Sequence, residues 1–578
     1  MHSLLLGTAA TAAASLALGS LVVGCADENE PETHVKRLSD PSTRAASVSR
    51  LIQFFEDAMT RDNKDRNGPT VKPLLDMIVA PMTQACVAGD LDERTNSKLI
   101  KFLSDTRDPR AEACLVKALK DYKPGSTDED VRWTCRAVGA MKLKSAAAPL
   151  FEVFTKVKAS DPKGGGLIYR DVNDAMIALQ DPSWKQGLLD RLAHPVDTKN
   201  KMAMTDEAFW QIVSAEILGD MKAPEAIKPL LKLVLSPSKR AAGTSVTAVN
   251  ALVKIGKPSV APTVALLKGE DQDLVNYSKV ESLKELGDKA NDAAKKTAEN
   301  AYIGVAAAVL SMIGREECTA PLLDAMNTKM DEGTKATVAR ELPKLPKSEA
   351  VETAFKDAYE KTSPSANIEG AGARESMLDA STYFFDSELV PWYVKTAKNM
   401  KGEDSDLEPI REASLQAMLK VMKANQVDQI DELANIKGTA EGKPTTVGKG
   451  FEKEIKLTKD LLTECGDKIE CYIGKISDSK ANAQDTQFIG VKAAYMIGVL
   501  GKPEVRAQVV SALPKASNTV VRGVAVFAVE FLSPKGDKAI ADSLQKLVDA
   551  NEASKDGNKT ASDPDYRRVI YRLNARAQ

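Results

Sequence analysis

The sequence predicts an all-α fold, a superhelix or solenoid of stacked helical hairpins. The clearest hairpin spans residues 205–235, where Thr205 is placed to cap the first helix and Gly219 and Pro224 mark the turn. Its apolar residues recur every three or four positions: Phe209, Val213 and Ile217 in the first half, and Ile227, Leu230, Leu231 and Val234 in the second. Neither helix can bury its apolar face alone, so such hairpins must stack on one another.

The same turn recurs along the chain and reveals the repeat. Pairs of an apolar residue and Gly are predicted to end the first helix of each hairpin: Val138-Gly139, Leu218-Gly219, Ile255-Gly256, Ile313-Gly314 and Ile497-Gly498. Counted from Gly139 through Gln180 and Gly219 to Gly256, the repeats are 41, 39 and 37 residues long. Prolines are expected early in the second helices, where a missing N–H costs least: Pro149, Pro229, Pro262 and Pro321.

Three segments carry a family resemblance: AEILGDMKAPEAIKPLL, AVLSMIGREECTAPLL and AAYMIGVLGKPEV. They resemble bacterial HEAT-like repeats of the phycobilisome-lyase type, and the resemblance extends from Ser104 to Val548. It implies a HEAT/armadillo-like solenoid. It carries no bilin-handling residues onto this chain, so no cofactor is expected.

The amino-terminal residues predict export and lipid attachment. Residues 4–23 contain no charged side chain, as in a signal peptide, and residues 21–25, LVVGC, resemble the lipobox of bacterial lipoproteins. The resemblance implies that residues 1–24 are cleaved and that Cys25 carries acyl chains such as palmitate. Ala26, instead of Asp, follows the cysteine, which favours the outer membrane of a Gram-negative bacterium. The alternative is an uncleaved transmembrane anchor, because about 20 apolar residues can span a bilayer.

Composition divides the remaining chain into four predicted segments. Residues 25–44 are expected to be a flexible tether and residues 45–435 a repeat array. Residues 436–450 are rich in Gly, Pro and Thr and predict a loop, and residues 451–578 predict further repeats with a capping helix. The basic side of that last helix is expected to be solvated, with membrane phosphates as a second possibility: Arg567, Arg568, Arg572 and Arg576.

If the chain is exported, it reaches an oxidising compartment in which disulfide bonds can form. Cys465 and Cys471 flank a Gly-Asp turn between two helical segments and are predicted to pair. Cys114 is expected to pair with either Cys86 or Cys135, and Cys318 is expected to be a small core residue. A zinc site would require shorter cysteine spacings or histidine partners.

No catalytic residue or metal site is predicted. After cleavage the chain would keep only His34 and His194, and no nucleophile, metal or nucleotide motif occurs. The net charge of −2 argues against a nucleic-acid binder. One aromatic cluster either lines a ligand groove or packs between neighbouring hairpins: Tyr383, Phe384, Phe385, Trp392 and Tyr393.

These features favour a lipid-anchored scaffold that binds an envelope protein in a concave groove, with the contacts supplied by the second helix of each hairpin. The alternatives are an enzyme or small-ligand carrier that uses the aromatic cluster, and a purely structural envelope protein. A deep cavity with converging carboxylates would favour the enzyme or carrier, and an open groove would favour the scaffold.

Overall fold

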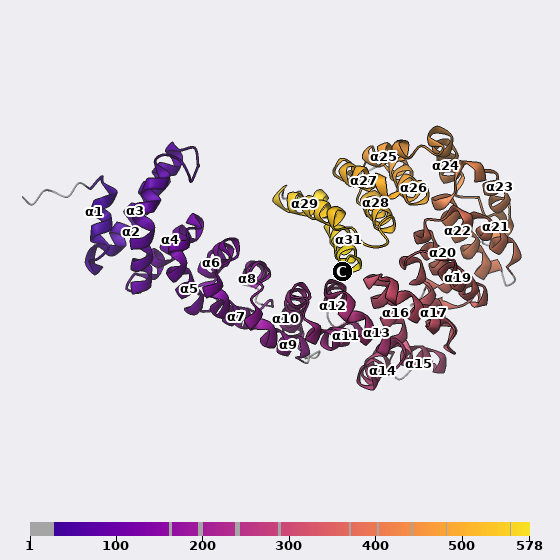
Figure 1. Cartoon of the computed structure of the whole chain (residues 1–578), viewed down its shortest axis with the longest axis horizontal. Helices are drawn as coiled ribbons and strands as arrows, with labels where there is room; N and C mark the ends of the chain where they lie inside the picture. The colour runs from indigo at the N-terminus through magenta and orange to yellow at the C-terminus, as the bar shows by residue number, and fades with distance from the viewer. Residues whose placement is uncertain are drawn as a thin grey trace, which may run out of the picture. The chain divides into compact units, whose positions relative to one another are not determined.

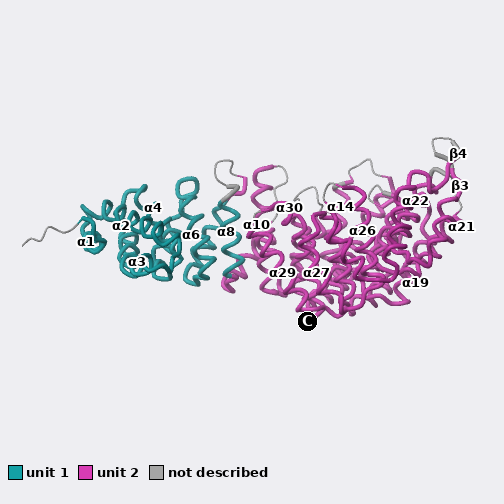
Figure 2. Tube along the Cα trace, turned by 90° about the horizontal axis from the view of Figure 1, so that it is seen from above, with its two compact units in different colours: residues 1–157, 167–179 teal, residues 158–166, 180–578 magenta. Residues whose placement is uncertain are grey.

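The computed structural model describes residues 28–160, 165–194, 200–236, 243–286, 291–368, 371–400, 404–440, 443–480, 483–554 and 556–578. The predicted lipidation site, Cys25, lies outside these residues. The described chain is almost entirely helical, which confirms the predicted all-α fold (Figure 1). It divides into two compact units, residues 1–157 with 167–179 (unit 1) and residues 158–166 with 180–578 (unit 2), shown in Figure 2. The division therefore does not fall at the predicted loop, residues 436–450.

Unit 1 is a row of helical hairpins in two layers. After α1 (Pro31–Arg37), one layer contains α2 (Pro41–Arg61), α4 (Glu93–Thr106) and α6 (Asp128–Met141), and the other contains α3 (Val71–Ala88), α5 (Glu112–Lys120) and α7 (Ala147–Lys156). The unit ends with α8 (Gly165–Leu179). Consecutive helices within each layer contact one another, which buries the apolar face that a single hairpin leaves open.

The prediction of a flexible tether over residues 25–44 is wrong for its described part. Pro31 and Pro41 each stand at the start of a helix, where the missing N–H costs nothing and the fixed φ favours the helix. The Asp40 carboxylate accepts a hydrogen bond from the Ser42 N–H, 2.9 Å away, and caps α2. His34 is buried, and its ring centroid lies 5.8 Å from that of Phe54.

In the part of the chain that the structure describes, α3 is the one helix long and apolar enough to meet the criteria for a membrane span. Its 18-residue window has a mean hydropathy of 1.2, and half of the window is buried against other helices.

Unit 2 has an inner set of helices that are in contact in sequence order. They are α10 (Lys201–Asp220), α12 (Thr244–Ile255), α16 (Ala301–Ile313), α18 (Glu332–Ala339), α20 (Ala373–Ser381), α22 (Asp404–Val421), α26 (Gln484–Leu500), α28 (Thr519–Phe531) and α31 (Asp563–Arg576). Most of these are the first helices of their hairpins. The last of them, α31, also contacts α12 and α16, so the set from α12 to α31 forms a closed circuit (Figure 1).

The remaining helices of unit 2 cover the outside of this circuit or connect its members (Figure 1). They are α9 (Lys185–Ala193), α11 (Ile227–Leu235), α13 (Val260–Leu267), α14 (Gln272–Leu286), α15 (Asp292–Glu299), α17 (Thr319–Met326), α19 (Glu349–Lys361), α21 (Val390–Asn399), α23 (Asp428–Ala434), α24 (Glu452–Cys465), α25 (Ile469–Ser477), α27 (Arg506–Ala512), α29 (Lys538–Ser554) and α30 (Gly557–Thr560). The predicted prolines stand at the third position of α7, α11, α13 and α17, each after a 3-10 turn. This confirms how the second helices begin.

Specific polar contacts join the two ends of the circuit. Arg315, just after α16, donates to the carbonyl of Ala575 in α31 at 2.6 Å. Arg572 in α31 donates to the carbonyl of Lys344, which follows α18, at 3.0 Å. The Lys254 ammonium of α12 lies 4.5 Å from the ring centroid of Tyr571. The last helix is therefore part of the core of unit 2, and the prediction of a solvated basic side is wrong for Arg572 and Arg576, whereas Arg567 and Arg568 are 35% and 38% exposed.

Two short hairpins interrupt the helices. β1 (Asn367–Ile368) pairs with β2 (Ala371–Gly372), and β3 (Lys437–Ala440) pairs antiparallel with β4 (Lys443–Thr446). The second hairpin occupies the predicted loop, and its first strand contacts α22. The loop prediction is therefore wrong for residues 437–440 and 443–446, because strands this short give no periodic signal.

α12 and α16 end as predicted, just before Gly256 and Gly314, but α10 begins and ends elsewhere. α10 starts at Lys201, because the Asn200 side chain accepts hydrogen bonds from the Met202 and Ala203 N–H groups, and Thr205 lies inside the helix. Gly219 also lies inside α10, where an added Cβ would be 2.8 Å from the Cα of Ala251 in α12. Gly219 therefore lets consecutive first helices approach closely instead of ending the helix.

Candidate functional site

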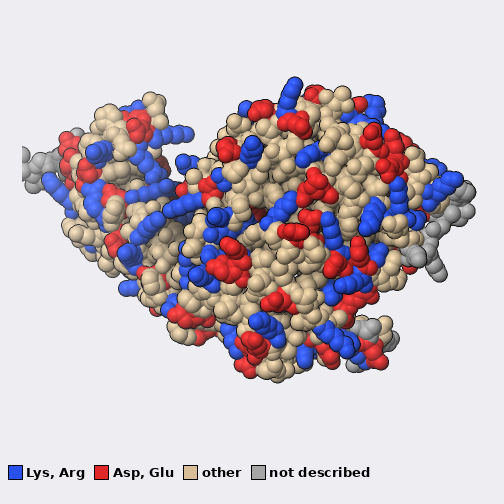
Figure 3. Space-filling view, turned by 45° about the vertical axis from the view of Figure 1, so that its right-hand side comes forward, with Lys and Arg blue, Asp and Glu red and all other residues tan. Residues whose placement is uncertain are grey.

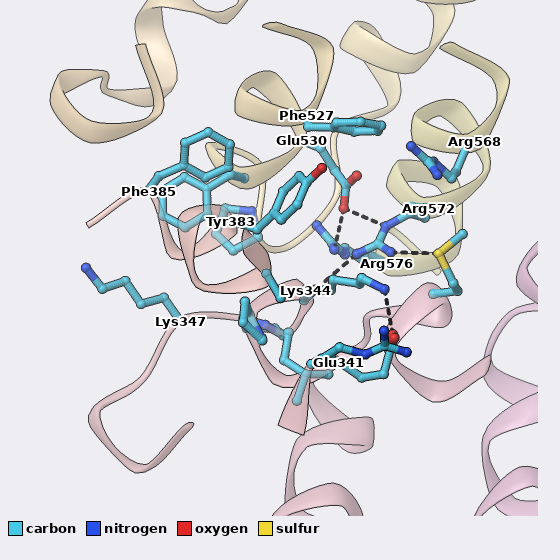
Figure 4. A pocket seen from close by; sticks show the side chains of 18 of the residues that line it. Glu341, Lys344, Lys347, Tyr383, Phe385, Phe527, Glu530, Arg568, Arg572 and Arg576 are labelled. Atoms are coloured by element: carbon cyan, nitrogen blue, oxygen red, sulfur yellow. Dashed lines mark hydrogen bonds and ion pairs between the residues drawn. The ribbon is translucent and has the colours of Figure 1, made fainter. Parts of the chain in front are cut away.

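A cavity of about 600 Å³ lies inside the closed circuit of unit 2 (Figure 4). Its walls come from α16, residues 340–347 after α18, α20 with the turn that follows it, α28 and α31. The predicted arrangement, with second helices supplying the contacts, is therefore wrong for unit 2, where mainly first helices face inward. Six lining residues are cationic and three are acidic: Arg340, Lys344, Lys347, Arg568, Arg572 and Arg576, against Glu341, Asp379 and Glu530.

Glu530 is the buried centre of this charge cluster. The Nε of Arg572 and the Nη2 of Arg576 both donate to its Oε1, at 2.5 and 2.7 Å (Figure 4). Burial alone would raise the pKa of Glu530, but the two guanidinium groups hold it below its usual value. Burial lowers the pKa of Arg576 to about 10, against the opposing effect of Glu530, and the positive charge of Arg572 adds to the lowering. The Glu530 carboxylate is thus the counterion of two guanidinium groups.

The other carboxylates at the cavity already have cationic partners. Lys344 Nζ lies 2.7 Å from Glu341, which also accepts a hydrogen bond from the Ser311 hydroxyl. Asp379 is paired with Lys420 at 2.8 Å. Each of these two carboxylates therefore lies beside a cation of the chain itself.

Two arginines are less well satisfied than the acids. Among the residues that the structure describes, Arg340 makes no ion pair, and its buried Nε has no hydrogen-bond partner. The buried Nε of Arg576 also lacks a partner, although its Nη2 binds Glu530. Arg568 is paired with Asp565 at 3.2 Å, and its guanidinium lies 4.3 Å from the ring centroid of Phe527.

The predicted aromatic cluster is divided by the structure. Tyr383 and Phe385 line the cavity together with Phe527 and Phe531 from α28 (Figure 4). The ring centroids of Phe385 and Phe531 lie 4.9 Å apart, and those of Tyr383 and Phe527 lie 6.1 Å apart. Burial raises the pKa of Tyr383 to about 12, so its hydroxyl stays protonated at neutral pH. These two residues face a ligand-sized space.

The other three aromatic residues of the cluster pack within the fold. Phe384 and Trp392 are both buried. The ring centroid of Phe384 lies 5.4 Å from that of Phe355, and the ring centroid of Trp392 lies 5.0 Å from that of Tyr359. The buried hydroxyl of Tyr393 shares a hydrogen bond of 2.7 Å with the Ser381 hydroxyl. The groove prediction is therefore wrong for Phe384, Trp392 and Tyr393, which fill the space between hairpins.

A second candidate surface lies on the first helices of unit 1. Trp133 in α6 is half-buried, and the Lys101 ammonium of α4 lies 5.7 Å from its ring centroid. Arg136, which is exposed, and Arg132 both bind the Asp171 carboxylate of α8, at 2.8 and 3.0 Å. Tryptophan and arginine are the residues most often found at the centres of protein interfaces.

The cysteines form two disulfide bonds. Cys465 and Cys471 are bonded, as predicted, and Cys86 pairs with Cys114, which settles the pairing that the sequence left open. Cys135 and Cys318 are free and buried, and burial raises the pKa of Cys318 to about 11. Within the described ranges, no group of three or more His, Cys, Asp or Glu side chains is placed to hold a metal ion.

Sequence reasoning missed Arg340 and Glu530. Glu530 had a recognisable signal, because it is the lone carboxylate of α28 in an otherwise largely apolar helix, and a buried acid requires a cationic partner. Arg568, Arg572 and Arg576 recur at four-residue intervals and so share one side of α31. Arg340 had no such signal, because only the tertiary structure brings it to the cavity.

Comparisons with known proteins do not identify a family. No family model matches the chain, and no curated protein matches it. One solved chain, from a study of a phosphorylation switch that controls the interaction between cadherin and beta-catenin, is 14% identical and has a TM-score of 0.25. That match covers 95% of this chain and 99% of the solved chain. At so low a TM-score the likeness has no bearing on function.

Proposed function

We propose that this protein is a binding scaffold of the bacterial cell envelope, held at the membrane by acyl chains on Cys25. The scaffold binds an envelope protein, and Ala26 after the lipobox cysteine favours the outer membrane as its location. Two or more acyl chains, at about 0.8 kcal/mol per buried methylene, provide a firm anchor.

The two disulfide bonds support the export part of this proposal. Cys86–Cys114 and Cys465–Cys471 use four of the seven cysteines in the chain. Disulfides persist in the periplasm and at cell surfaces and are rare in the cytosol. A chain with a lipobox-like segment and two disulfides fits an exported lipoprotein.

The protein-binding part rests on the surface of unit 1 formed by Lys101, Trp133 and Arg136. These residues come from two adjacent first helices and combine a large half-buried ring with exposed cations. Such a combination can supply an aromatic anchor surrounded by a polar rim. Over the face of the molecule seen in Figure 3, basic and acidic residues are interspersed, which agrees with the net charge of −2 and supports a protein partner more than a nucleic acid.

The experiment is photo-crosslinking in cells that express the tagged full-length protein. A photoreactive residue in place of Lys101 is expected to capture one abundant envelope protein, and Trp133→Gln is expected to reduce that product at least tenfold. The matched control is Trp210→Gln, because Trp210 is also half-buried with a cation over its ring, Arg191 at 4.4 Å. Recovery of the tagged protein alone would contradict the scaffold function.

A separate measurement tests the anchor. Cells grown with radioactive palmitate are expected to label the wild-type protein, and Cys25→Ala is expected to abolish the label and release the protein from the membrane fraction. A label that persists in the Cys25→Ala variant would contradict lipidation at this residue.

A further inference from the structure

The cavity in unit 2 has more positive charge than its own carboxylates can balance. Glu530 accepts from both Arg572 and Arg576 through one oxygen atom, so the pair of arginines has a single counterion. Arg340 lines the same cavity and makes no ion pair with any described residue. Two guanidinium charges thus lack a carboxylate of their own: Arg576 is buried, where an unpaired charge is costly, and Arg340 is half-buried.

Two of the cavity's arginines, Arg340 and Arg576, also have a buried Nε without a hydrogen-bond partner. Both are donors without an acceptor, and both belong to residues that line the cavity. The Arg576 side chain is only 5% exposed, so bulk water does not compensate it. A bound anion would pair with the positive charge of these arginines through their Nη groups, because the Nε atoms themselves are covered by the chain.

Aromatic side chains also line the cavity. Tyr383 and Phe385 follow α20, and Phe527 and Phe531 belong to α28. A volume of about 600 Å³ lies within the range of small-molecule sites, roughly 300 to 1,000 Å³. The cavity therefore offers both cationic and aromatic side chains to the same ligand.

We propose that this cavity binds a small organic phosphate, a phosphate monoester with an aromatic or apolar body. The phosphate group would pair with the guanidinium groups of Arg340 and Arg576. The aromatic or apolar part of the ligand would lie against Tyr383, Phe385 and Phe527. This site is independent of the protein-binding surface proposed above, because it belongs to unit 2.

The number of unmatched charges favours a phosphate monoester over a carboxylate. A phosphate monoester carries a charge of about −1.5 to −2 at pH 7 and three strong acceptor oxygens. Guanidinium groups match such oxygens in planar, two-donor geometry. A monocarboxylate would balance only one of the two positive charges, so it should bind more weakly.

The test is isothermal titration calorimetry of the full-length protein in a nonionic detergent at pH 7.5. Phenyl phosphate is the probe, because it combines the dianion with a ring. Inorganic phosphate lacks the ring, benzyl alcohol lacks the charge, and benzoate has a single charge. We expect saturable binding of phenyl phosphate, with each of the other three compounds at least tenfold weaker.

Variants assign the binding to the cavity. Arg340→Gln is expected to weaken the binding of phenyl phosphate at least tenfold, because one charge-assisted contact is lost. Arg340→Lys, which keeps the charge, is expected to retain more of the affinity. Since Arg340 makes no ion pair in the described structure, Arg340→Gln should leave the melting temperature unchanged. The matched control is Arg94→Gln, an exposed position in unit 1.

Three results would overturn the proposal. They are no saturable binding of phenyl phosphate, equal binding of phenyl phosphate and benzyl alcohol, and undiminished binding by a folded Arg340→Gln variant. Loss of binding in Arg94→Gln would likewise place the site outside this cavity. Because the assay contains no partner protein, its outcome is separate from that of the crosslinking experiment.

Discussion

Units 1 and 2 are built from the same hairpin but use its first helix differently. In unit 1 the first helices α2, α4 and α6 form a row that presents Trp133 and Arg136 partly to solvent. In unit 2 the first helices form a closed circuit, and α31 contacts both α12 and α16. The comparison shows that similar repeats can offer either a surface for a large partner or a cavity for a small ligand.

The difference depends on where charge is buried. In unit 1 the cluster around Asp171 is only partly buried: the Arg136 side chain is 52% exposed, whereas those of Arg132 and Asp171 are 14% and 11% exposed. Unit 2 buries Arg572 and Arg576, each 5% exposed, with Glu530 at 9%. Exposed ion pairs contribute little to stability, whereas removing one member of a buried pair is expensive.

The largest expected effect therefore comes from Glu530→Ala. This change leaves two buried guanidinium groups without their carboxylate and should cost about 3 to 5 kcal/mol. Hydrogen exchange in α31 and α12 is expected to increase, while exchange in unit 1 stays the same. Glu504→Ala, at an exposed position on the outside of unit 2, is the control. Unchanged hydrogen exchange in α12 would show that the contact between α12 and α31 does not depend on the ion pairs of Glu530.

The second prediction concerns unit 1. Cys86 and Cys114 connect α3 to α5 across 28 residues, and chain-entropy reasoning assigns such a loop a stabilisation of roughly 3.5 kcal/mol. The double substitution Cys86→Ala and Cys114→Ala is expected to raise hydrogen exchange throughout α3 and α5.

The disulfide in unit 2 provides the comparison for that experiment. Cys465 and Cys471 are only six residues apart, so their bond should contribute less, roughly 2 kcal/mol. The corresponding double alanine variant is expected to affect only the ends of α24 and α25. A larger effect there than at Cys86 and Cys114 would contradict this ranking.

The third prediction tests the close approach of first helices. Gly219→Ala would place a Cβ 2.8 Å from the Ala251 Cα, and the overpacking cost, about 1 to 3 kcal/mol, should outweigh the better helix propensity of alanine. Gly474→Ala in α25 meets nothing within 4 Å and should stabilise the protein by about 0.5 to 1 kcal/mol. Thermal melts of the two variants should therefore shift in opposite directions, and shifts of the same sign would argue against tight packing at Gly219.

The smallest expected effect is on pH dependence. The pKa of Glu530 is lower in the folded protein than its ordinary 4.5, although burial opposes the arginines and limits the shift. The unfolded chain then binds more protons as the pH falls, so the stabilisation is complete above pH 4.5 and is lost as the pH drops through the folded pKa. Urea unfolding of the wild type between pH 7 and 3 should show this loss, and Glu530→Gln should reduce it. If the free energy of unfolding falls equally in both proteins between pH 7 and 3, the loss is due to other carboxylates.

The sequence predicted what depends on local periodicity. The hairpin, the prolines of the second helices and the Cys465–Cys471 bond are each determined within a few residues, and the structure contains all three. The circuit could not be predicted in this way. Arg315 and Ala575 are 260 residues apart, and no local pattern relates them.

The aromatic cluster shows the same limit at the site. Tyr383 and Phe384 are adjacent in sequence, yet one lines the cavity and the other packs on Phe355. Adjacent residues in the 3-10 turn Thr382–Phe384 point in different directions, and the left-handed backbone at Phe385, with φ of 45°, ends that turn. Which side chain faces the cavity depends on that turn and on α28, and neither is visible from composition.

The closed circuit of unit 2 is tested most directly by a photoreactive amino acid in place of Gln578. A Cβ added at Gly256 would lie 2.3 Å from the Gln578 Oε1. If the circuit is closed, we therefore expect an intrachain crosslink to a peptide that contains residues 244–259. Mass spectrometry of the digested protein identifies that peptide. Crosslinks confined to α28 and α29, with none to α12 or to the turn that follows it, would contradict the closed circuit.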